Sequence, residues 1–575
     1  MKSFFPLPSS LSRFKANPKA IFIILSGLIA VWMLWISRDY GITWDEWSHA
    51  LNGTFSLRYL LGDVKDLSLL NQLSPQLFCD PLYMATGFVY GLLHGSVLDF
   101  ARQGLTQASN FEGFFAAAHL FNAFAGFLAI LFTGLLAREL GNWKTGMLAL
   151  VLIFLSPRFL GNCMNDPKDI PLAAVHVFFF YFMIRWIKTL PRPPLRLSAA
   201  LALGIAAGIW VRAGALILIP YLFFFSSAYV FYKQWAGKVP ADWTGLAWRA
   251  SLIAALGYAG GSLLWPYAQQ NPLINPFKTL FIFSNYTLWD NPILFEGNIL
   301  KASALPWHYL PKWILISSPL FFLSGLCFLV FFLRRLVRTH DVFFLSMTAV
   351  GALSPLLAII LHRSIVYDSW RHVLFIYPLW IVLISLTFQA AWAMAVRSRS
   401  QVLFGIFFLV QAAEPAFWMI QNHPNEYVYF NPLVGGLSGA FKQYETDYWG
   451  NSLRKGAEWL AKYHARVAPG RPLLVRSSGC VMTSYPILHN QFGAAYHPFS
   501  YPEDFLTNSP LYYIIYAPLY LPQIAFREPW DYALELPRGW PPSEVERHWP
   551  PLGTLYEVKA DGVALCAVVK NPLKK

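Results

Sequence analysis

The sequence predicts an all-α polytopic membrane domain over residues 1-420, followed by an α/β domain over residues 421-575 outside the membrane. Hydrophobic residues make up 56% of the 575 residues and charged residues only 13%, whereas about a quarter of the residues in a soluble protein are charged. About eleven apolar runs approach the length of roughly 20 residues that a bilayer requires. Beyond the last run Pro, Glu, Asp and Lys become denser, which indicates a separate domain in water.

These apolar runs are expected to form the transmembrane helices. They cover residues 21-36, 113-137, 147-164, 169-187, 198-211, 213-232, 250-266, 313-333, 342-361, 372-392 and 402-420. The first run has no small-residue cleavage site and therefore resembles an uncleaved signal anchor. We interpret residues 198-232 as two short spans hinged at Arg212, because one long span would place every later basic loop on the opposite side.

Short basic segments alternate with longer segments that are aromatic and often acidic. The basic segments are 1-19, 138-146, 185-197, 233-249, 334-341 and 397-400. They hold 18 of the 44 Lys and Arg residues but three of the 30 acidic residues, so the formal net charge of +14 resides on their side. This is the positive-inside pattern of a cytoplasmic N-terminus. It removes nucleic acid as a partner and predicts that the C-terminal domain lies on the outer side of the membrane.

Within residues 421-575 the periodicity predicts one amphipathic helix and several strands. The helix covers 452-467, the strands cover 472-475 and 512-516, and a hairpin joins 554-556 to 564-569 through Asp561-Gly562. Cys480 and Cys566 lie in this domain, where a disulfide and two separate small apolar side chains both remain open.

Several classes of enzyme are excluded by missing motifs. The sequence contains no GxxxxGK[ST] loop, no GxGxxG and no HExxH, so it shows no site for ATP or a dinucleotide and no zincin motif. Any substrate is therefore expected to arrive already activated.

The strongest local feature is the carboxylate pair Asp45-Glu46, which follows the first span by a few residues. An acidic residue that faces a cavity at a membrane is a functional candidate, although the start of a solvated loop would look the same. The pair opens the first outer loop, residues 38-112, whose stretch 82-94 is amphipathic and suits the membrane interface.

Cationic residues occur in three further outer segments, where the positive-inside rule does not place them. They are Arg158, Lys168 in Asn165-Asp166-Pro167-Lys168-Asp169, Arg212 at the hinge, and Arg371 in Tyr367-Asp368-Ser369-Trp370-Arg371-His372. A tight turn and a snorkelling arginine are the structural alternatives. A bound anion would account for the position of all four cationic residues on the outer side.

One base surrounded by cations suits transfer of a sugar from a lipid phosphate. The phosphate leaves as a stable anion, so no second carboxylic acid is needed, whereas glycosidases require two. A carboxylate, Asp45, would take the proton of an acceptor hydroxyl, while Arg and Lys would stabilise the departing phosphate. Glu46 would then orient the acceptor.

With these residues the sequence resembles the GT-C membrane glycosyltransferases, in particular protein O-mannosyltransferases and bacterial aminoarabinose transferases that use polyprenyl-phosphate sugars. The resemblance covers roughly residues 20-420 and rests on Asp45-Glu46, on 165-171, on Pro306-Trp307-His308-Tyr309-Leu310-Pro311 and on 367-378. It implies a GT-C fold, Asp45 as the base and outer cations that bind the lipid phosphate. It also implies that the first outer loop and the loop before the eighth span border the substrate cavity.

These observations together predict an inverting single displacement from a polyprenyl-phosphate sugar to a hydroxyl of a glycan, lipid or protein. The expected phosphate ligands are Lys168, Arg212, Arg371 and Arg158, and the expected substrate contacts are Asp166, Tyr367, His372, Trp307 and His308. The carboxylate pair is not a DxD, which argues against the metal-dependent oligosaccharyltransferase branch, so no metal and no cofactor are expected. A lipid or sugar transporter, a non-catalytic assembly subunit and a ligase with a diphosphate-linked donor remain as alternatives.

Overall fold

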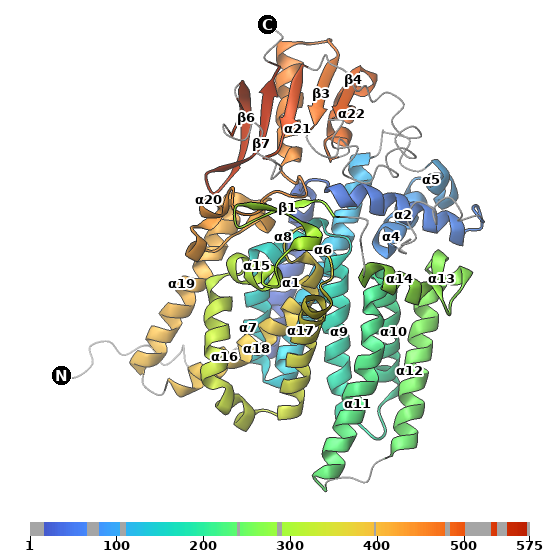
Figure 1. Ribbon diagram of the computed structural model, residues 1–575, viewed down its shortest axis with the longest axis vertical. Coiled ribbons are helices and arrows are strands. Elements are labelled where there is room, and N and C mark those ends of the chain that lie inside the picture. Colours follow the sequence, from blue (N-terminus) through green and yellow to red (C-terminus); the bar gives the residue numbers. More distant parts are fainter. Residues whose placement is uncertain are drawn as a thin grey trace, which may run out of the picture.

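The chain forms a helical bundle with a small sheet stacked on one end (Figure 1). The computed structural model describes residues 17–65, 80–103, 111–237, 242–284, 290–395, 398–477, 483–500, 531–537, 549–551 and 553–571. The predicted fold class, a polytopic helical domain followed by an α/β domain, is confirmed within these residues.

All eleven apolar runs are helical. The helices are α1 (Pro18–Ile36), α6 (Phe111–Leu140), α7 (Trp143–Phe154) with α8 (Pro157–Asn165), α9 (Asp169–Lys188), α10 (Leu195–Val211), α11 (Leu218–Trp235), α12 (Trp243–Leu263), α16 (Leu320–Thr339), α17 (Val342–His362), α18 (Tyr377–Met394) and α19 (Ser398–Asn422). By length and composition, eight helices among the described residues suffice to cross a membrane, or nine if α7 and α8 form one broken span. Helix α10 is shorter than this length and α12 does not meet both conditions, so the described residues support eight or nine of the eleven predicted spans.

The third predicted run is not one straight span. Helices α7 and α8 meet at an angle of 71°, because Pro157 at the start of α8 offers no amide hydrogen to continue the helix. The Ser156 hydroxyl donates to the carbonyl of Leu152 and contacts the hydroxyl of Tyr377. Gly161 then allows α8 to lie against Tyr427, since a Cβ at Gly161 would be 2.5 Å from the Tyr427 nitrogen. The bend buries α8 and turns its C-terminus towards the end that carries the sheet.

The break predicted at Arg212 within residues 198-232 is present, although α10 alone is shorter than the helices that suffice to cross a membrane. Helix α10 ends at Val211, Arg212 is extended, and the 3-10 helix η5 (Ala213–Ile217) leads into α11. The Arg212 guanidinium reaches Asp169 at the first residue of α9, so the turn between α10 and α11 lies at the start of α9.

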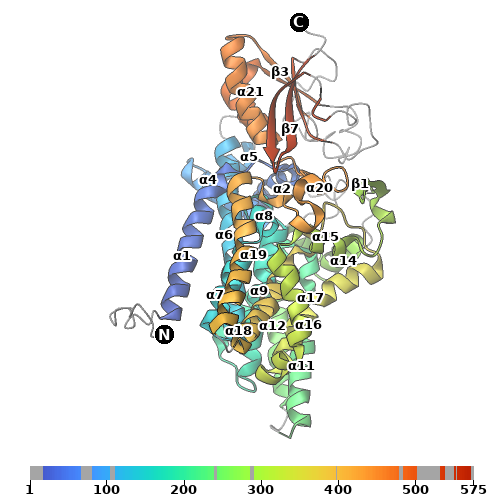
Figure 2. The same cartoon turned by 90° about the vertical axis from the view of Figure 1, so that its left-hand side faces the viewer.

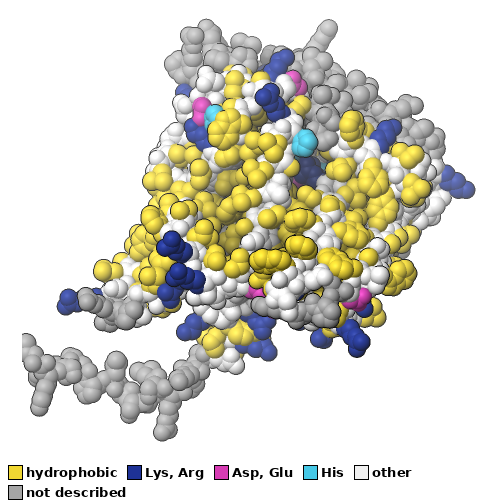
Figure 3. Space-filling model, turned by 60° about the horizontal axis from the view of Figure 1, so that its bottom comes forward, with side chains coloured by type: hydrophobic (Ala, Val, Ile, Leu, Met, Phe, Trp, Pro, Cys, Tyr) yellow, Lys and Arg dark blue, Asp and Glu magenta, His cyan; other side chains and the backbone are white. Residues whose placement is uncertain are grey.

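The basic loops gather at the end of the bundle opposite the sheet, which we call the basic end. Figure 3 shows Lys and Arg side chains clustered there below an apolar flank. At this end the Lys188 ammonium at the close of α9 lies 2.9 Å from the Glu139 carboxylate at the close of α6. The chain therefore separates its loops by charge, as the sequence pattern predicts.

At the other end, short elements lie across the tops of the membrane helices (Figure 1). These are α2 (Trp44–Leu60), α4 (Pro81–Leu93), α5 (Val97–Gln103), α13 (Pro266–Gln270), α14 (Asn275–Ser284), the hairpin of β1 (Pro292–Phe295) and β2 (Asn298–Lys301), and α15 (Tyr309–Ser317). The predicted amphipathic stretch 82-94 is helical as α4, and its Leu92 and Leu93 are exposed.

The C-terminal domain contains one mixed five-stranded sheet. Its elements are α20 (Gly436–Ala440), α21 (Leu453–Val467), β3 (Leu473–Ser477), α22 (Tyr485–Phe492), β4 (Tyr496–Ser500), β5 (Tyr532–Glu535), β6 (Thr554–Ala560) and β7 (Val563–Lys570). The strand order is β4-β3-β5-β7-β6, with β3 parallel to β4 and β5, and β7 antiparallel to β5 and β6. Helix α21 lies along one face of the sheet (Figure 2).

Most predictions for this domain are confirmed. The helix 452-467 is α21, and the hairpin β6–β7 turns at Asp561 and Gly562, which both have positive φ. Strands β4 and β5 were not predicted, while the predicted strand 512-516 and Cys480 lie outside the described residues. Leu453 and Leu460 of α21 share one apolar core with Tyr83 of α4, so the domain rests directly on the first outer loop.

Candidate functional site

Arg371 joins three carboxylates at the end of the bundle beneath the sheet. Its Nη1 lies 3.1 Å from Asp45 Oδ2 and 3.4 Å from Asp169 Oδ2, and its Nη2 lies 3.0 Å from Asp368 Oδ2. The side chain of Arg371 is 2% exposed, whereas that of Asp45 is 32% exposed. Asp45 is therefore the member of this group that a substrate can reach.

Two aromatic rings complete the surroundings of Arg371. Its guanidinium carbon lies 4.9 Å from the ring centre of Tyr367 and 5.2 Å from that of Trp449. Such contacts stabilise a cation that has lost its water. The backbone beside it is unusual, since Asp368 and Ser369 both have positive φ, a conformation that residues other than Gly seldom adopt and that concentrates at functional sites.

Asp169 links this group to the hinge between α10 and α11. Its Oδ1 lies 2.9 Å from Arg212 Nη1, and its backbone amide donates to Asp166 Oδ1 at 3.0 Å. The amide of Lys168 also donates to Asp166 Oδ1, at 3.3 Å. The turn between α8 and α9 thus places Asp166, Lys168 and Asp169 beside Arg212 and Arg371.

Four separate segments build this site because each begins or ends a helix at the same end of the bundle. Asp45 lies in the first turn of α2, where the helix dipole favours a carboxylate. Asp169 is the first residue of α9, Arg212 caps the end of α10, and Arg371 opens the 3-10 helix η7 (Arg371–Ile376) before α18. We call Asp45, Asp166, Lys168, Asp169, Arg212, Asp368 and Arg371 the ionic cluster.

The environment divides the carboxylates of the ionic cluster into two kinds. Burial raises the pKa of Asp45, but the charges of Arg371, Lys168 and His49 outweigh it and leave that pKa below its ordinary value. Burial raises the pKa of Asp368 to about 6 in spite of Arg371, and the charge of Asp45 adds to the rise. Asp45 is therefore an ionised proton acceptor at neutral pH.

The other two ionisable groups of the turn shift in opposite directions. Burial and the charge of Asp169 raise the pKa of Asp166 well above its ordinary value. Burial and the charge of Arg371 lower the pKa of Lys168. Both shifts reduce the charge that the turn holds out of water.

Glu46 does not lie with Asp45 as its partner, contrary to the predicted role. Its Oε2 accepts a hydrogen bond from the Thr43 amide at 2.7 Å, and its Oε1 accepts one from the Tyr83 hydroxyl at 2.8 Å. The His119 Nε2 lies 3.0 Å from the same Oε1. Consecutive residues of a helix point in different directions, so Glu46 faces the interior and ties the start of α2 to α4 and α6.

Arg158 lies apart from the ionic cluster. It is buried on α8, its Nη2 donates to the Tyr429 carbonyl at 3.2 Å, and its guanidinium lies 5.3 Å from the ring centres of Trp313 and Phe430. Its Nε and Nη1 are buried without a hydrogen-bond partner among the described residues. No ion pair joins Arg158 to a carboxylate in this part of the chain, which leaves its charge available to an anion.

The remaining predicted contacts lie at different distances from the cluster. Tyr367 lies on Arg371, and His372 packs edge-on against Tyr367 with ring centres 4.7 Å apart. Trp307 and His308 instead lie beside the β1–β2 hairpin, where His308 Nε2 is 3.6 Å from Glu296 Oε1 and Trp307 is 72% exposed. The structure therefore brings Tyr367 and His372 to the cluster and leaves Trp307 and His308 at its outer rim.

The sequence reasoning missed Asp169 and Asp368 as site residues. Both stand within segments that it selected, and the available signal was that each cation there has an acidic neighbour. Arg212 and Arg371, which were expected to bind a phosphate, form ion pairs with these carboxylates. Among the described residues, no group of three or more His, Cys, Asp or Glu side chains is arranged to hold a metal ion.

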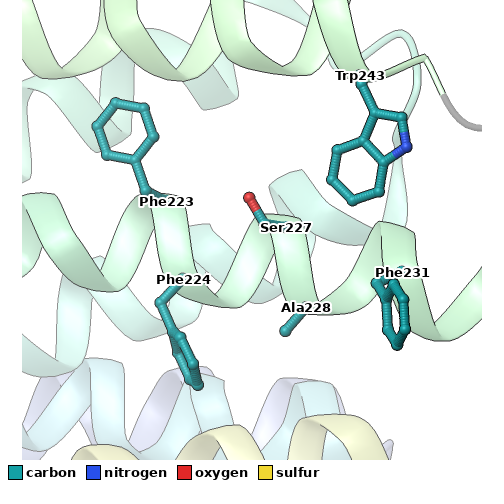
Figure 4. A pocket seen from close by; sticks show the side chains of 6 residues that line it. All are labelled: Phe223, Phe224, Ser227, Ala228, Phe231 and Trp243. Carbon is teal, nitrogen blue, oxygen red and sulfur yellow. The ribbon is translucent and has the colours of Figure 1, made fainter.

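A surface hollow elsewhere on the molecule carries no comparable chemistry. It lies between α11 and α12 towards the basic end, and five of its six lining side chains, all but Ser227, are apolar (Figure 4). The ionic cluster is the candidate site.

Comparison with known proteins finds likeness in fold only. No protein-family model and no curated protein sequence matches the chain. Among solved structures, ArnT from Cupriavidus metallidurans bound to undecaprenyl phosphate is 14% identical, with a TM-score of 0.47 over 95% of this chain and 98% of ArnT. The apo oligosaccharyltransferase of Archaeoglobus fulgidus is 13% identical, with a TM-score of 0.48 over 91% of this chain and 70% of that chain.

A further solved structure is the Archaeoglobus fulgidus oligosaccharyltransferase AglB in complex with an inhibitory peptide and a dolichol-phosphate. It is 14% identical to this chain and has a TM-score of 0.46 over 91% of this chain and 70% of its own. ArnT and AglB are both GT-C proteins, the class that the sequence resembles. At these TM-scores the likeness is one of overall architecture and assigns no residue of this chain a role.

Proposed function

We propose that this protein is a membrane glycosyltransferase that moves a sugar from a polyprenyl-phosphate carrier to an acceptor hydroxyl. The observation that carries the proposal is the position of Asp45, an accessible and ionised carboxylate beside the buried guanidinium of Arg371. A base next to fixed cations suits a reaction in which a hydroxyl loses a proton while an anion departs.

The reaction is a single displacement at the anomeric carbon. Asp45 accepts the proton of the acceptor hydroxyl, and the acceptor oxygen forms the new bond to the anomeric carbon. The bond from that carbon to the phosphate oxygen breaks, and its electron pair leaves with the polyprenyl phosphate. The attacking oxygen and the leaving group occupy opposite faces of the sugar, so the anomeric configuration inverts.

Arg371, Lys168 and Arg212 are the proposed ligands of the donor phosphate. Arg371 is shared among three carboxylates, so a phosphate oxygen that binds its guanidinium competes with Asp45. Loss of this neighbouring charge returns the pKa of Asp45 towards its ordinary value and makes the carboxylate a stronger base. Donor binding thereby activates the group that accepts the proton.

The buried Arg158 is proposed as a further anion contact, since it has two donors free among the described residues and no acidic partner there. Tyr367, His372 and Asp166 line the reacting centre in this proposal. Trp307 and His308, at the rim, are placed to meet the acceptor or the outer part of the sugar. No metal or cofactor is assigned a step.

We place the site on the periplasmic face of a bacterial inner membrane, with the basic end in the cytoplasm. The position of the short basic loops at the end opposite the ionic cluster supports this orientation (Figure 3). A transporter would carry its charged residues along a path through the membrane. The ionic cluster lies at one end of the bundle instead, which favours covalent transfer.

Transfer is tested with the purified full chain and a polyprenyl-phosphate donor that carries a radiolabelled sugar. The assay counts label in covalent product after extraction of an acceptor mixture of glycan, lipid A and protein. The expected result is label in one acceptor class with the wild type and none with Asp45→Asn. Label that only crosses the bilayer of sealed vesicles, without entering a product, contradicts the proposal and favours the transporter.

A further inference from the structure

Asn451, which lies just before α21 of the C-terminal domain, uses its side-chain amide fully. Its Oδ1 accepts hydrogen bonds from the Gly41 amide at 2.8 Å and from Asn165 Nδ2 at 3.0 Å. Its Nδ2 donates to the Pro424 carbonyl at 2.9 Å and to Asn425 Oδ1 at 2.8 Å. Asn451 is 2% exposed, and these four bonds exhaust what a primary amide offers in its plane.

The two residues that donate to Asn451 each precede a part of the ionic cluster. Gly41 stands four residues before Asp45, and Asn165 stands directly before Asp166. Asn165 Nδ2 also donates to the Gly41 carbonyl at 2.9 Å. Gly41, Asn165 and Asn451 thus form a closed set of hydrogen bonds between the segment of the base and the turn that carries Lys168.

The fit at Gly41 leaves no room for a side chain. A Cβ at Gly41 would lie 2.4 Å from the Asn451 carbonyl oxygen and 3.1 Å from its carbon. The backbone of Asn451 is also held in place, because its backbone amide donates a hydrogen bond to Asp447 Oδ1 at 3.0 Å. The position of the Gly41 backbone is therefore determined by a residue of the C-terminal domain.

We propose that Asn451 is a positioning residue that holds the Asp45 segment against the turn between α8 and α9 and so sets the contact between Asp45 and Arg371. Asn451 touches none of the proposed reacting atoms and acts through Gly41 and Asn165. The effect of Asn451 on catalysis rests on the proposed function, whereas its effect on the geometry of Asp45 does not.

The charge around Asp45 reports this geometry. The groups that act on Asp45 are His49 on its own helix, Lys168 from the turn, and Arg371 with Asp368 from the segment before α18. Arg371 also carries Asp169. If the Asp45 segment moves away from Arg371, Asp45 loses its nearest cation and titrates at higher pH.

The variants are Asn451→Ala, which removes all four bonds, and Gly41→Ala, which keeps Asn451 and inserts one methyl group at the same contact. The matched control is Asn422→Ala. Asn422 is also a buried amide. It donates to the Trp418 carbonyl within α19 and accepts from the Asp561 amide of the β6–β7 turn, and neither partner belongs to the ionic cluster. All three variants are made in the full chain in lipid nanodiscs.

The first measurement is an infrared titration of the Asp45 carboxyl, taken as the difference between each variant and its Asp45→Asn partner. We expect Asn451→Ala and Gly41→Ala to move the titration of Asp45 to higher pH by about half a pH unit or more, while Asn422→Ala leaves it unchanged. An unchanged titration in both variants, or an equal shift in Asn422→Ala, overturns the proposal.

The second measurement is transfer. We expect kcat to fall about tenfold or more in both variants, with little change in KM for the donor. We expect kcat of the double variant to be no lower than that of the less active single variant, because both substitutions disturb the same contact. If the two reductions in kcat multiply in the double variant, the two residues do not act through one shared contact. If the wild type transfers no sugar but the titration shifts as expected, the proposed function fails and the positioning role stands.

Discussion

Arg371 Nη1 lies between Asp45 Oδ2, at 3.1 Å, and Asp169 Oδ2, at 3.4 Å, so one nitrogen joins the start of α2 to the start of α9. The proposed base and one proposed phosphate ligand are therefore in direct contact. An anion that reaches Arg371 changes the electrostatic environment of Asp45 directly.

Replacement of Asp45 by Asn removes the proton acceptor and leaves the side chain nearly unchanged in shape. We expect kcat to fall about a hundredfold to ten-thousandfold, while the midpoint of thermal unfolding changes little, because the buried Arg371 keeps Asp169 and Asp368 as partners. Radiolabel transfer and thermal unfolding measure the two effects. A variant that turns over at the wild-type rate removes Asp45 from the mechanism.

The pH dependence follows from the lowered pKa of Asp45. A lowered pKa keeps the carboxylate ionised as the pH falls, so the acid limb of kcat/KM is expected below the ordinary value of about 3.9. Lys168→Met removes one of the charges that lower the pKa of Asp45, and Arg371→Met removes the charge with the largest effect. The acid limb is therefore expected to move to higher pH in both variants, and further in Arg371→Met. A limb that moves to lower pH in either variant contradicts the electrostatic account.

Glu46→Gln tests the structural role that its contacts indicate. A glutamine cannot accept from the Thr43 amide and the Tyr83 hydroxyl with both of its terminal atoms, so one buried donor loses its partner. We expect the free energy of unfolding to fall by about 1 to 3 kcal/mol and kcat of the folded fraction to change little. Full stability combined with a large loss of kcat would instead return Glu46 to the catalytic group.

Arg158→Met tests whether the buried guanidinium binds part of the donor. The variant keeps an apolar stem against Trp313 and Phe430 but loses the two unpaired donors. We expect the affinity for polyprenyl-phosphate sugar to fall about tenfold to a hundredfold, with Arg158→Lys between the variant and the wild type. Binding in nanodiscs, followed by tryptophan fluorescence, measures it. Equal affinity in all three proteins excludes Arg158 from the donor site.

Removal of divalent metal is expected to leave transfer unchanged. The described carboxylates of the ionic cluster are engaged by Arg371, Arg212 and backbone amides, so the proposed charge stabilisation comes from the protein. Activity with and without EDTA, at fixed ionic strength, is the measurement. Loss of transfer with EDTA that is restored by one added cation contradicts the prediction.

Hydropathy and charge pattern predicted most of the fold, because both depend on local sequence. The apolar runs became helices, and the hinge at Arg212 followed from loop charge alone. The bend between α7 and α8 was missed because the predicted span 147-164 was extended through Pro157 into the less apolar segment that forms α8. For the candidate site, unexpected cations pointed to three segments, and the structure brings Lys168, Arg212 and Arg371 from these segments together.

The sequence could not predict which cation pairs with which carboxylate in those segments. Whether Arg371 meets Asp45, Asp169 or Asp368 depends on how four helix ends come together, and no spacing along the chain encodes it. The direction of Glu46 was open for the same reason, because adjacent carboxylates on a helix diverge and only the fold decides which one is buried. The role of Asn451 required a contact across 410 residues.

That separation has a consequence for how the protein is made. Gly41 leaves the ribosome early and Asn451 late, after every long apolar helix from α1 to α19 has been synthesised. Membrane insertion and completion of the site are thus distinct stages of biogenesis. Under the proposed function, a nascent chain that has inserted all of its helices still lacks the amide of Asn451, which holds the segment of Asp45 in place.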